Sequence, residues 1–137
     1  MKTTILKRKL KGFNLMEMMV AMIIAGILIT AAIVAFAPAI SEAKSMEAQQ
    51  QLEFLHSMEK MYFFKSSKYS SSFSEIKYEA PKLTTEDGSA NYRIEIVEAG
   101  TNTFKARATA IADFDGDGSL NVWEIDQDKK LKEVTPD

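Results

Sequence analysis

The chain has 137 residues, of which 46% are hydrophobic and 26% charged, a composition that fits a folded protein and excludes disordered, collagenous and low-complexity chains. It contains no cysteine and a single histidine, His56. Disulfide frameworks and thiolate metal sites are thereby excluded, and a histidine zinc site or a Ser-His-Asp triad is disfavoured. The formal net charge of −2 is an average over an uneven distribution along the sequence.

The N-terminal part has the pattern of a membrane anchor. No acidic residue precedes Gly12, whereas five basic ones do: Lys2, Lys7, Arg8, Lys9 and Lys11. Residues 18–40 then carry no charge, and a helix of that length, at ~1.5 Å per residue, spans a bilayer. The basic flank predicts that the leader stays in the cytoplasm and that everything after Ile40 lies outside. A secretory signal fits poorly, because its apolar core is shorter and ends in a small-residue cleavage site.

A simple one-span anchor leaves Glu17 unexplained. This carboxylate stands at the start of the apolar segment, and a charge near hydrocarbon costs about 2.5 kcal/mol or more at the bilayer centre. It follows the run Gly12-Phe13-Asn14-Leu15-Met16. Together with the basic leader and the long apolar helix, this run resembles the processing site of type IV pilins and pseudopilins.

The resemblance implies a processing and assembly pathway. A membrane prepilin peptidase would cut after Gly12 and methylate the new amine of Phe13. In that family, the residue corresponding to Glu17 is thought to meet the amine of a neighbouring subunit during assembly. The spacing agrees, because Phe13 and Glu17 are four residues apart and would share one face of a helix. Pairing with the amine would offset the cost of burying the carboxylate.

The rest of the sequence predicts a helix continuing into a small sheet. Ser41–Phe64 continues the helix with an apolar stripe. Gly26 and Pro38 are expected to interrupt the helix earlier, either as a tolerated kink in the membrane or as the ends of a segment that loosens when subunits pack in a filament. A serine-rich loop at 65–74 and a connecting region at 75–90 follow. Alternating residues predict a hairpin of strands and two further strands: residues 92–96, 104–110, 122–125 and 131–134.

We therefore predict an α+β fold in three parts. Residues 1–12 are a basic prepilin leader, and residues 13–64 are a long helix whose first half spans the membrane. Residues 65–137 form an antiparallel sheet region packed on the second half of the helix, as in type IV pilins. The stripe expected to face the sheet is Ala48, Leu52, Leu55 and Tyr62, with Phe54, Met58 and Met61 beside it.

Residues 113–124 match the spacing of the twelve-residue EF-hand calcium loop. Calcium takes six to eight oxygen ligands, and alternating carboxylates with a glycine at Gly118 suit a tight turn around such an ion. The flanks read as strands rather than helices, so either Glu124 or Asp126 is expected to close the site. The alternative is a solvated acidic turn. The predicted Ca²⁺ ligands are Asp113, Asp115, Asp117, Ser119, Asn121 and Glu124 or Asp126.

The sequence carries no recognisable catalytic constellation, so we expect a structural protein rather than an enzyme. Without the five basic leader residues, the chain has 12 basic and 19 acidic residues, which argues against nucleic-acid binding. The resemblance implies an inner-membrane precursor that polymerises through its helix, with pilus or secretion machinery as partner. Its product is an extracellular type IV pilus serving adhesion, motility or DNA uptake. The alternatives are a major pseudopilin of a periplasmic type II secretion pseudopilus and a monomeric membrane-anchored calcium-binding protein.

Overall fold

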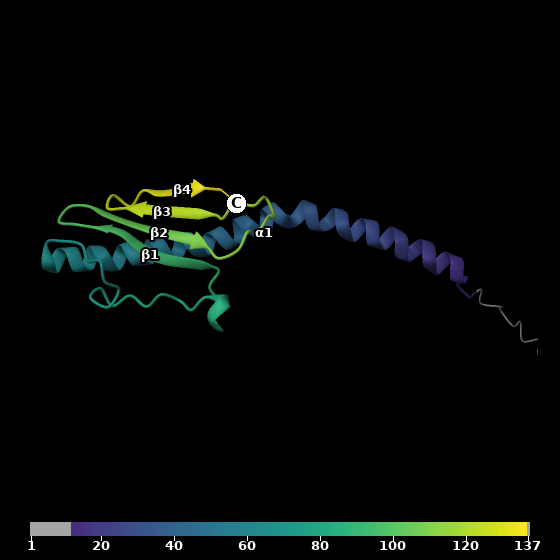
Figure 1. Cartoon of the computed structure of the whole chain (residues 1–137), viewed down its shortest axis with the longest axis horizontal. Helices are drawn as coiled ribbons and strands as arrows, with labels where there is room; N and C mark the ends of the chain where they lie inside the picture. Colours follow the sequence, from purple (N-terminus) through teal and green to yellow (C-terminus); the bar gives the residue numbers. More distant parts are fainter. Residues whose placement is uncertain (1–11, 137) are drawn as a thin grey trace, which may run out of the picture. The chain divides into compact units, whose positions relative to one another are not determined.

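The computed structural model describes residues 12–136. All of the predicted leader except Gly12 therefore lies outside the described part, including its basic residues Lys2 to Lys11. The chain divides into two compact units between Phe36 and Ala37. We call residues 12–36 the stem and residues 37–136 the head. The elements are α1 (Leu15–Ser66), the short 3₁₀ turn η1 (Thr84–Glu86) and four strands, β1 (Tyr92–Ala99), β2 (Phe104–Ala110), β3 (Val122–Asp126) and β4 (Leu131–Thr135) (Figure 1).

Helix α1 is a single helix of 52 residues. It begins where the carbonyl of Asn14 accepts the backbone N–H groups of Glu17 at 2.9 Å and Met18 at 3.1 Å. It ends at Ser66, because Ser67 takes the left-handed conformation with φ 54° that commonly terminates helices. Gly26 and Pro38 do not end the helix: both lie inside the continuous α1. Proline removes one hydrogen bond, and the good helix formers on either side propagate the helix past it.

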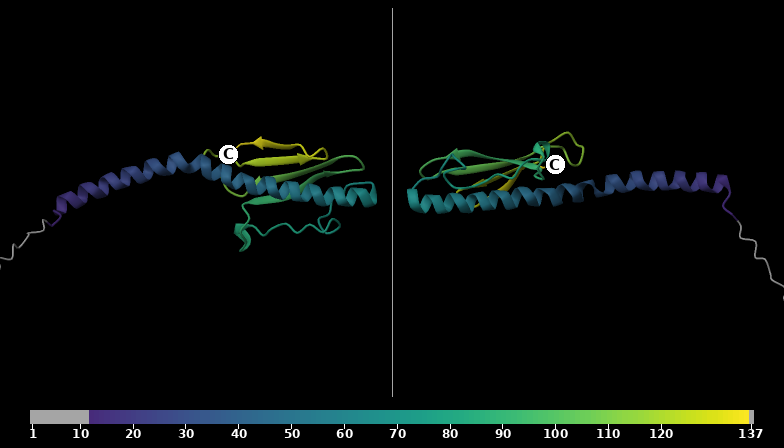
Figure 2. Two further views of the ribbon diagram at one scale, coloured as in Figure 1. Left: turned by 180° about the vertical axis from the view of Figure 1, so that it is seen from behind. Right: turned by 90° about the horizontal axis from the view of Figure 1, so that it is seen from below.

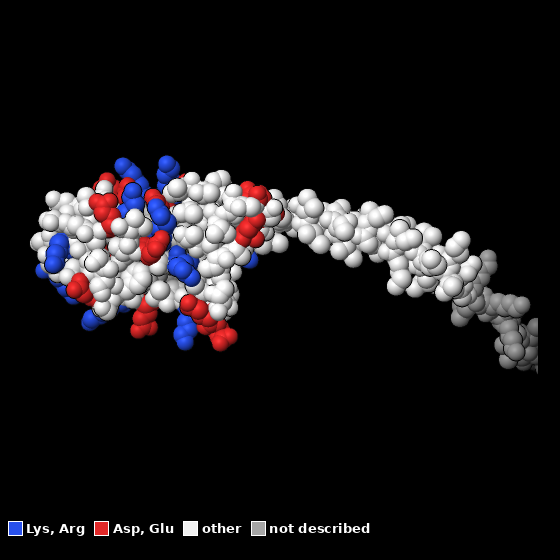
Figure 3. Space-filling view, in the orientation of Figure 1, with Lys and Arg blue, Asp and Glu red and all other residues white. Residues whose placement is uncertain are grey.

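The stem consists of the apolar first part of α1 and the residues just before it. Every residue from 12 to 36 is exposed, and the helix is long and apolar enough to cross a membrane. Figure 3 shows the charged side chains gathered on the head, whereas residues 18–36 carry none. Exposed apolar surface of this extent marks contact with lipid or with another protein.

The head contains an antiparallel meander in the order β1-β2-β3-β4. The first two strands pair in a register that sets Tyr92 opposite Ala110 and Ala106 opposite Ile96. All four predicted strands are therefore present. Strand β1 extends to Ala99, beyond the predicted end at residue 96, by means of a bulge between Ile96 and Glu98. The bulge permits pairing to continue past the point where strict alternation stops.

The core lies between the sheet and the head portion of α1. The right-hand view of Figure 2 shows the sheet along one side of this helix portion. Ala48, Leu52 and Leu55 are fully buried against the inward-facing residues of β2, which are Phe104, Ala106, Ala108 and Ala110. The predicted core stripe is confirmed, and the alanines let the helix approach the sheet closely. Phe54 and Met61 are instead about half exposed, at 48% and 53%.

The segment between α1 and β1 packs into the same core as the sheet. Tyr69, Ile76 and Tyr78 from this segment are buried in the same core. The Tyr78 hydroxyl donates to Gln51 Oε1 at 3.0 Å, and burial raises the pKa of Tyr78 to about 12. The segment is therefore a structural part of the head, although its sequence has the composition of a loop.

Candidate functional site

The predicted processing site lies just before the first turn of α1. Gly12 and Phe13 are outside the helix, and 77% of Phe13 is exposed. Apart from its two sequence neighbours, no described residue lies within 4 Å of the position where a Cβ atom on Gly12 would stand. The peptide bond between these residues is therefore open to an enzyme.

The proposed pairing of Phe13 with Glu17 needs one correction. Because α1 begins at Leu15, Phe13 precedes the helix and does not share a helical face with Glu17 in the uncut chain. Glu17 occupies the first turn of α1 and is exposed. A carboxylate there is favoured by the partial positive charge of the helix N-terminus, which sequence spacing did not reveal.

The second candidate site is the loop between β2 and β3. Its three carboxylates, from Asp113, Asp115 and Asp117, offer ligand atoms that all lie within 4.8 Å of one another. Gly116 and Gly118 have φ of +85° and +93°, a conformation that glycine adopts without strain. These glycines let the loop turn tightly enough to bring the alternating carboxylates together.

Backbone N–H groups hold the aspartates in place. Asp113 accepts the N–H of Gly116 on Oδ1 at 2.6 Å and that of Gly118 on Oδ2 at 2.8 Å. Hydrogen bonds from Gly118 and then Gly116 lower the pKa of Asp113 below its usual value of 3.8. Asp115 and Asp117 accept the N–H groups two residues further on, at 3.0 and 2.7 Å. These donors partly offset the mutual repulsion of the carboxylates and leave lone pairs for a cation.

Of the next two predicted ligands, Asn121 is engaged outside the loop and Ser119 is not. Asn121 is 1% exposed; its Oδ1 accepts the Tyr92 hydroxyl at 2.9 Å, and its Nδ2 donates to Glu133 at 2.7 Å. Ser119 stays in the loop, where its N–H donates to Asp117.

Neither residue expected to close the site reaches the aspartates. Glu124 lies in β3, and its Oε1 accepts Arg107 Nη2 at 2.6 Å on the neighbouring strand. Asp126 is at the other end of β3, where its Oδ1 accepts the N–H groups of Asp128 and Lys130, both at 2.9 Å. Because strand geometry fixes these directions, the structure brings together Asp113, Asp115 and Asp117 but neither Glu124 nor Asp126. A bound cation would take its other ligands from backbone oxygens or water.

Phe114 ties the acidic loop to the head, a role that the sequence analysis missed. Its ring packs against Tyr92 with centroids 5.9 Å apart. Lys44 of α1 places Nζ 3.8 Å from the centroid of the same ring, a cation–π contact. The sequence could have indicated this role, because Phe114 stands between Asp113 and Asp115, and a large apolar side chain is unusual in a solvated turn.

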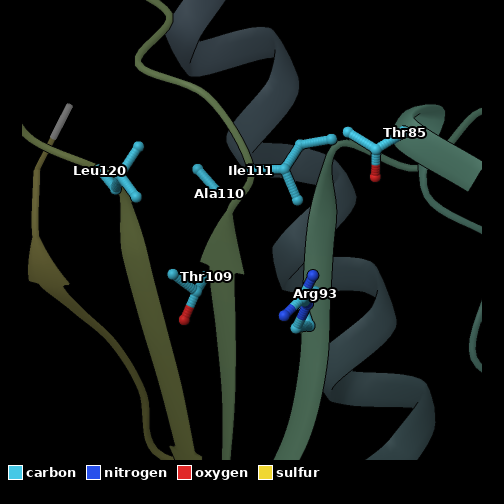
Figure 4. Close-up of a pocket in the computed structure, with 6 residues that line it drawn as sticks. All are labelled: Thr85, Arg93, Thr109, Ala110, Ile111 and Leu120. Atoms are coloured by element: carbon cyan, nitrogen blue, oxygen red, sulfur yellow. The ribbon is translucent and has the colours of Figure 1, made fainter.

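A shallow pocket of about 300 Å³ lies at the end of the sheet where the acidic loop joins β2 (Figure 4). Arg93 and the hydroxyls of Thr85 and Thr109 line it, together with Ala110, Ile111 and Leu120. It contains no carboxylate, histidine or lysine to act as a general base.

Comparison with known proteins supports the N-terminal site. A family model described as the prokaryotic N-terminal methylation motif matches residues 7–33. This motif is the signature of type IV pilins and pseudopilins and implies processing by a prepilin peptidase. The match covers the predicted cleavage site, Glu17 and most of the stem. No curated protein matches the chain.

Proposed function

We propose that this chain, which carries the methylation motif at residues 7–33, is a type IV pilin. In this proposal the precursor is anchored in the bacterial inner membrane with its head outside. A prepilin peptidase cuts between Gly12 and Phe13 and methylates the amine of Phe13. The mature subunit then polymerises through its stem into a surface filament.

The observation that carries the proposal is the exposed apolar stem, most of which the motif covers. Its side chains are exposed throughout residues 12–36, although almost all of them are apolar. In the precursor a bilayer would cover them, and after extraction only other apolar helices could do so. Each subunit of the filament brings one copy of this stem, so the stems can cover one another.

Glu17 fits this proposal as the residue that sets the position of each subunit. A carboxylate in an apolar bundle needs a cationic partner. Cleavage creates one at Phe13, where the new amine is positively charged at neutral pH. Since the amine and Glu17 of one chain are separated by the start of α1, pairing between neighbouring chains satisfies both groups.

We also propose that Asp113, Asp115 and Asp117 bind Ca²⁺. Support comes from the proximity of their ligand atoms, within 4.8 Å, and from the preference of calcium for carboxylate oxygens. The ion would offset most of the negative charge of the loop and fix it between β2 and β3. Because Phe114 contacts Lys44 of α1, ordering this loop would also stabilise its packing on the helix.

A major pseudopilin of a type II secretion system is the second candidate. The same motif and stem support it, and the resemblance allows a calcium site in such proteins. A membrane-anchored monomer that binds calcium is less well supported, because it gives no role to the cleavage motif or to Glu17.

Mass spectrometry of the native protein tests the central proposal. The mature chain should lack residues 1–12 and carry one additional methyl group on Phe13. Replacing Gly12 with leucine should leave the leader attached and abolish filaments. A native chain that keeps Met1, or that is cut beyond Ile40, would contradict the proposal.

A gene deletion then separates the two machines. Loss of surface filaments and motility with normal protein secretion supports a pilin. Loss of a secreted enzyme activity with intact filaments supports a pseudopilin.

A further inference from the structure

The head contains one carboxylate that neither the fold nor the proposed assembly explains. Glu59, on α1, is 0% exposed. Its Oε2 accepts the backbone N–H of Ser70 at 3.0 Å. Its Oε1 is buried and has no hydrogen-bond partner in the part of the chain that the structure describes. A buried carboxylate with a single donor is poorly compensated as an anion, because charged oxygens need several donors or a cation.

Ser70 connects Glu59 to a second carboxylate. Ser70 is 3% exposed, and its hydroxyl donates to Glu75 Oε2 at 2.5 Å. The same oxygen of Glu75 accepts the Tyr62 hydroxyl of α1 at 3.3 Å. Ser70 and Glu75, in the segment between α1 and β1, are therefore held to α1 by hydrogen bonds, of which the one to Glu59 is the most deeply buried.

The surrounding charges do not neutralise Glu59. Lys60 follows it in α1, but its Nζ contacts the Tyr69 hydroxyl at 3.1 Å and the Gln127 carbonyl at 3.3 Å. His56 lies one turn earlier, with Nε2 3.3 Å from the same carbonyl. Glu75, in the segment between α1 and β1, adds a second negative charge near Glu59. Burial raises the pKa of Glu59 above 4.5, the Ser70 N–H opposes this, and Glu75 raises it further.

We propose that Glu59 is a neutral carboxylic acid that holds residues 67–78 on α1, and that its ionisation at higher pH releases this segment. The segment contains Tyr69, Ile76 and Tyr78, whose side chains are buried in the core. Its release would expose those side chains and the aromatic residues Tyr62, Phe63 and Phe64 near the end of α1. The device is independent of the proposed filament, because it lies wholly within the head.

The direction of the pH effect follows from linkage. A carboxyl whose pKa is raised in the closed state stabilises that state fully below its unperturbed pKa, and the advantage falls as pH rises through the closed-state pKa. Each unit by which the closed carboxyl titrates above 4.5 makes closure tenfold less favourable at high pH than at low pH. The segment should therefore be most tightly held in acidic surroundings.

Two measurements on the full mature chain in detergent micelles test the proposal. The first follows the carboxyl carbon of Glu59 by NMR from acidic to mildly alkaline pH. The second measures the hydrogen-exchange protection of residues 69–78, corrected for intrinsic exchange rates. The variants are Glu59→Gln, which keeps the acceptor for Ser70 and removes the charge, and Glu53→Gln as control. Glu53 lies on the same helix with its side chain 51% exposed.

The wild-type carboxyl should titrate above 4.5, and protection should fall by the corresponding factor as pH rises. Glu59→Gln should remove the pH dependence of protection, whereas Glu53→Gln should keep it. A Glu59 carboxyl that titrates at or below 4.5 overturns the proposal. The proposal is also overturned if the Glu59→Gln variant retains the wild-type pH dependence of hydrogen-exchange protection. If that variant does not fold, the wild-type titration still decides the question.

Discussion

Arg107 on β2 and Glu124 on β3 form a two-pronged ion pair across neighbouring strands. Nη2 and Nε of the arginine lie 2.6 and 2.9 Å from the same carboxylate oxygen. The two residues are direct register partners, so the backbone pairing itself directs Glu124 toward Arg107. This contact explains why the last position of the EF-hand pattern does not reach the aspartates.

The first prediction is that Glu124→Gln leaves calcium binding unchanged. It should lower the free energy of unfolding by up to ~1 kcal/mol, because the ion pair is partly exposed. Asp113→Asn should weaken calcium binding severely, since it removes one of the three clustered carboxylates. Calorimetric titration with calcium measures both effects. If Glu124→Gln abolished binding while Asp113→Asn had no effect, the assignment of ligands would be wrong.

A second prediction concerns the acid side of the same loop. Backbone hydrogen bonds lower the pKa of Asp113 below 3.8, so its charged form stabilises the ordered loop. That contribution should be complete above about 3.8 and disappear as pH falls through the lowered pKa. The amide signals of Gly116 and Gly118 should therefore shift together in acid, with chelator present. Asp113→Asn should remove this shared transition, and its persistence in that variant would contradict the argument.

Core packing supplies a third prediction. Leu52 is 0% exposed, and Leu52→Ala should lower the free energy of unfolding of the head by about 2–5 kcal/mol. Met46→Ala is the control on the same helix, because Met46 is 58% exposed, and it should change stability by less than about 0.5 kcal/mol. Urea unfolding can be followed by the fluorescence of Trp123, the single tryptophan. Equal losses in both variants would show that this face of α1 is not the core.

The fourth prediction treats Asn121 as a structural residue. Asn121→Ala should destabilise the head by about 1–3 kcal/mol, because it removes the buried hydrogen bonds that Asn121 makes with Tyr92 and Glu133. Asn102→Ala, in the exposed turn between β1 and β2, should be nearly neutral. The same urea experiment measures both. An Asn121→Ala variant of normal stability that fails to bind calcium would return this residue to the ligand set.

The fifth prediction separates assembly from folding. Glu17→Leu should give a processed, membrane-inserted protein with a normal head but few or no filaments, because the incoming amine loses its partner. Glu17→Gln should also impair assembly if charge rather than size is required. Filament yield by electron microscopy and processing by mass spectrometry report the two effects separately. Wild-type filament yield from Glu17→Leu would remove the proposed role.

Tertiary contacts changed the sequence-based view of the calcium loop most. The spacing correctly grouped Asp113, Asp115 and Asp117, since residues two apart in a tight turn stay close. It misplaced the later positions because the EF-hand pattern assumes a helix after the loop. Here the chain enters β3, where alternate side chains point to opposite faces. Glu124 consequently meets Arg107, and Asp126 caps the next turn.

The sequence by itself determined what local chemistry dictates: the apolar stem, the cleavage motif, the four strands and the inward face of α1. These follow from periodicity and composition, which act over a few residues. Only the tertiary structure decided which polar groups are buried and what each of them meets. Glu59 follows Leu55 by four residues and so shares the inward face of α1, but a charged residue is rarely fully buried. Glu59 is buried because the segment around Ser70 folds back over α1, a contact between residues that no local pattern relates.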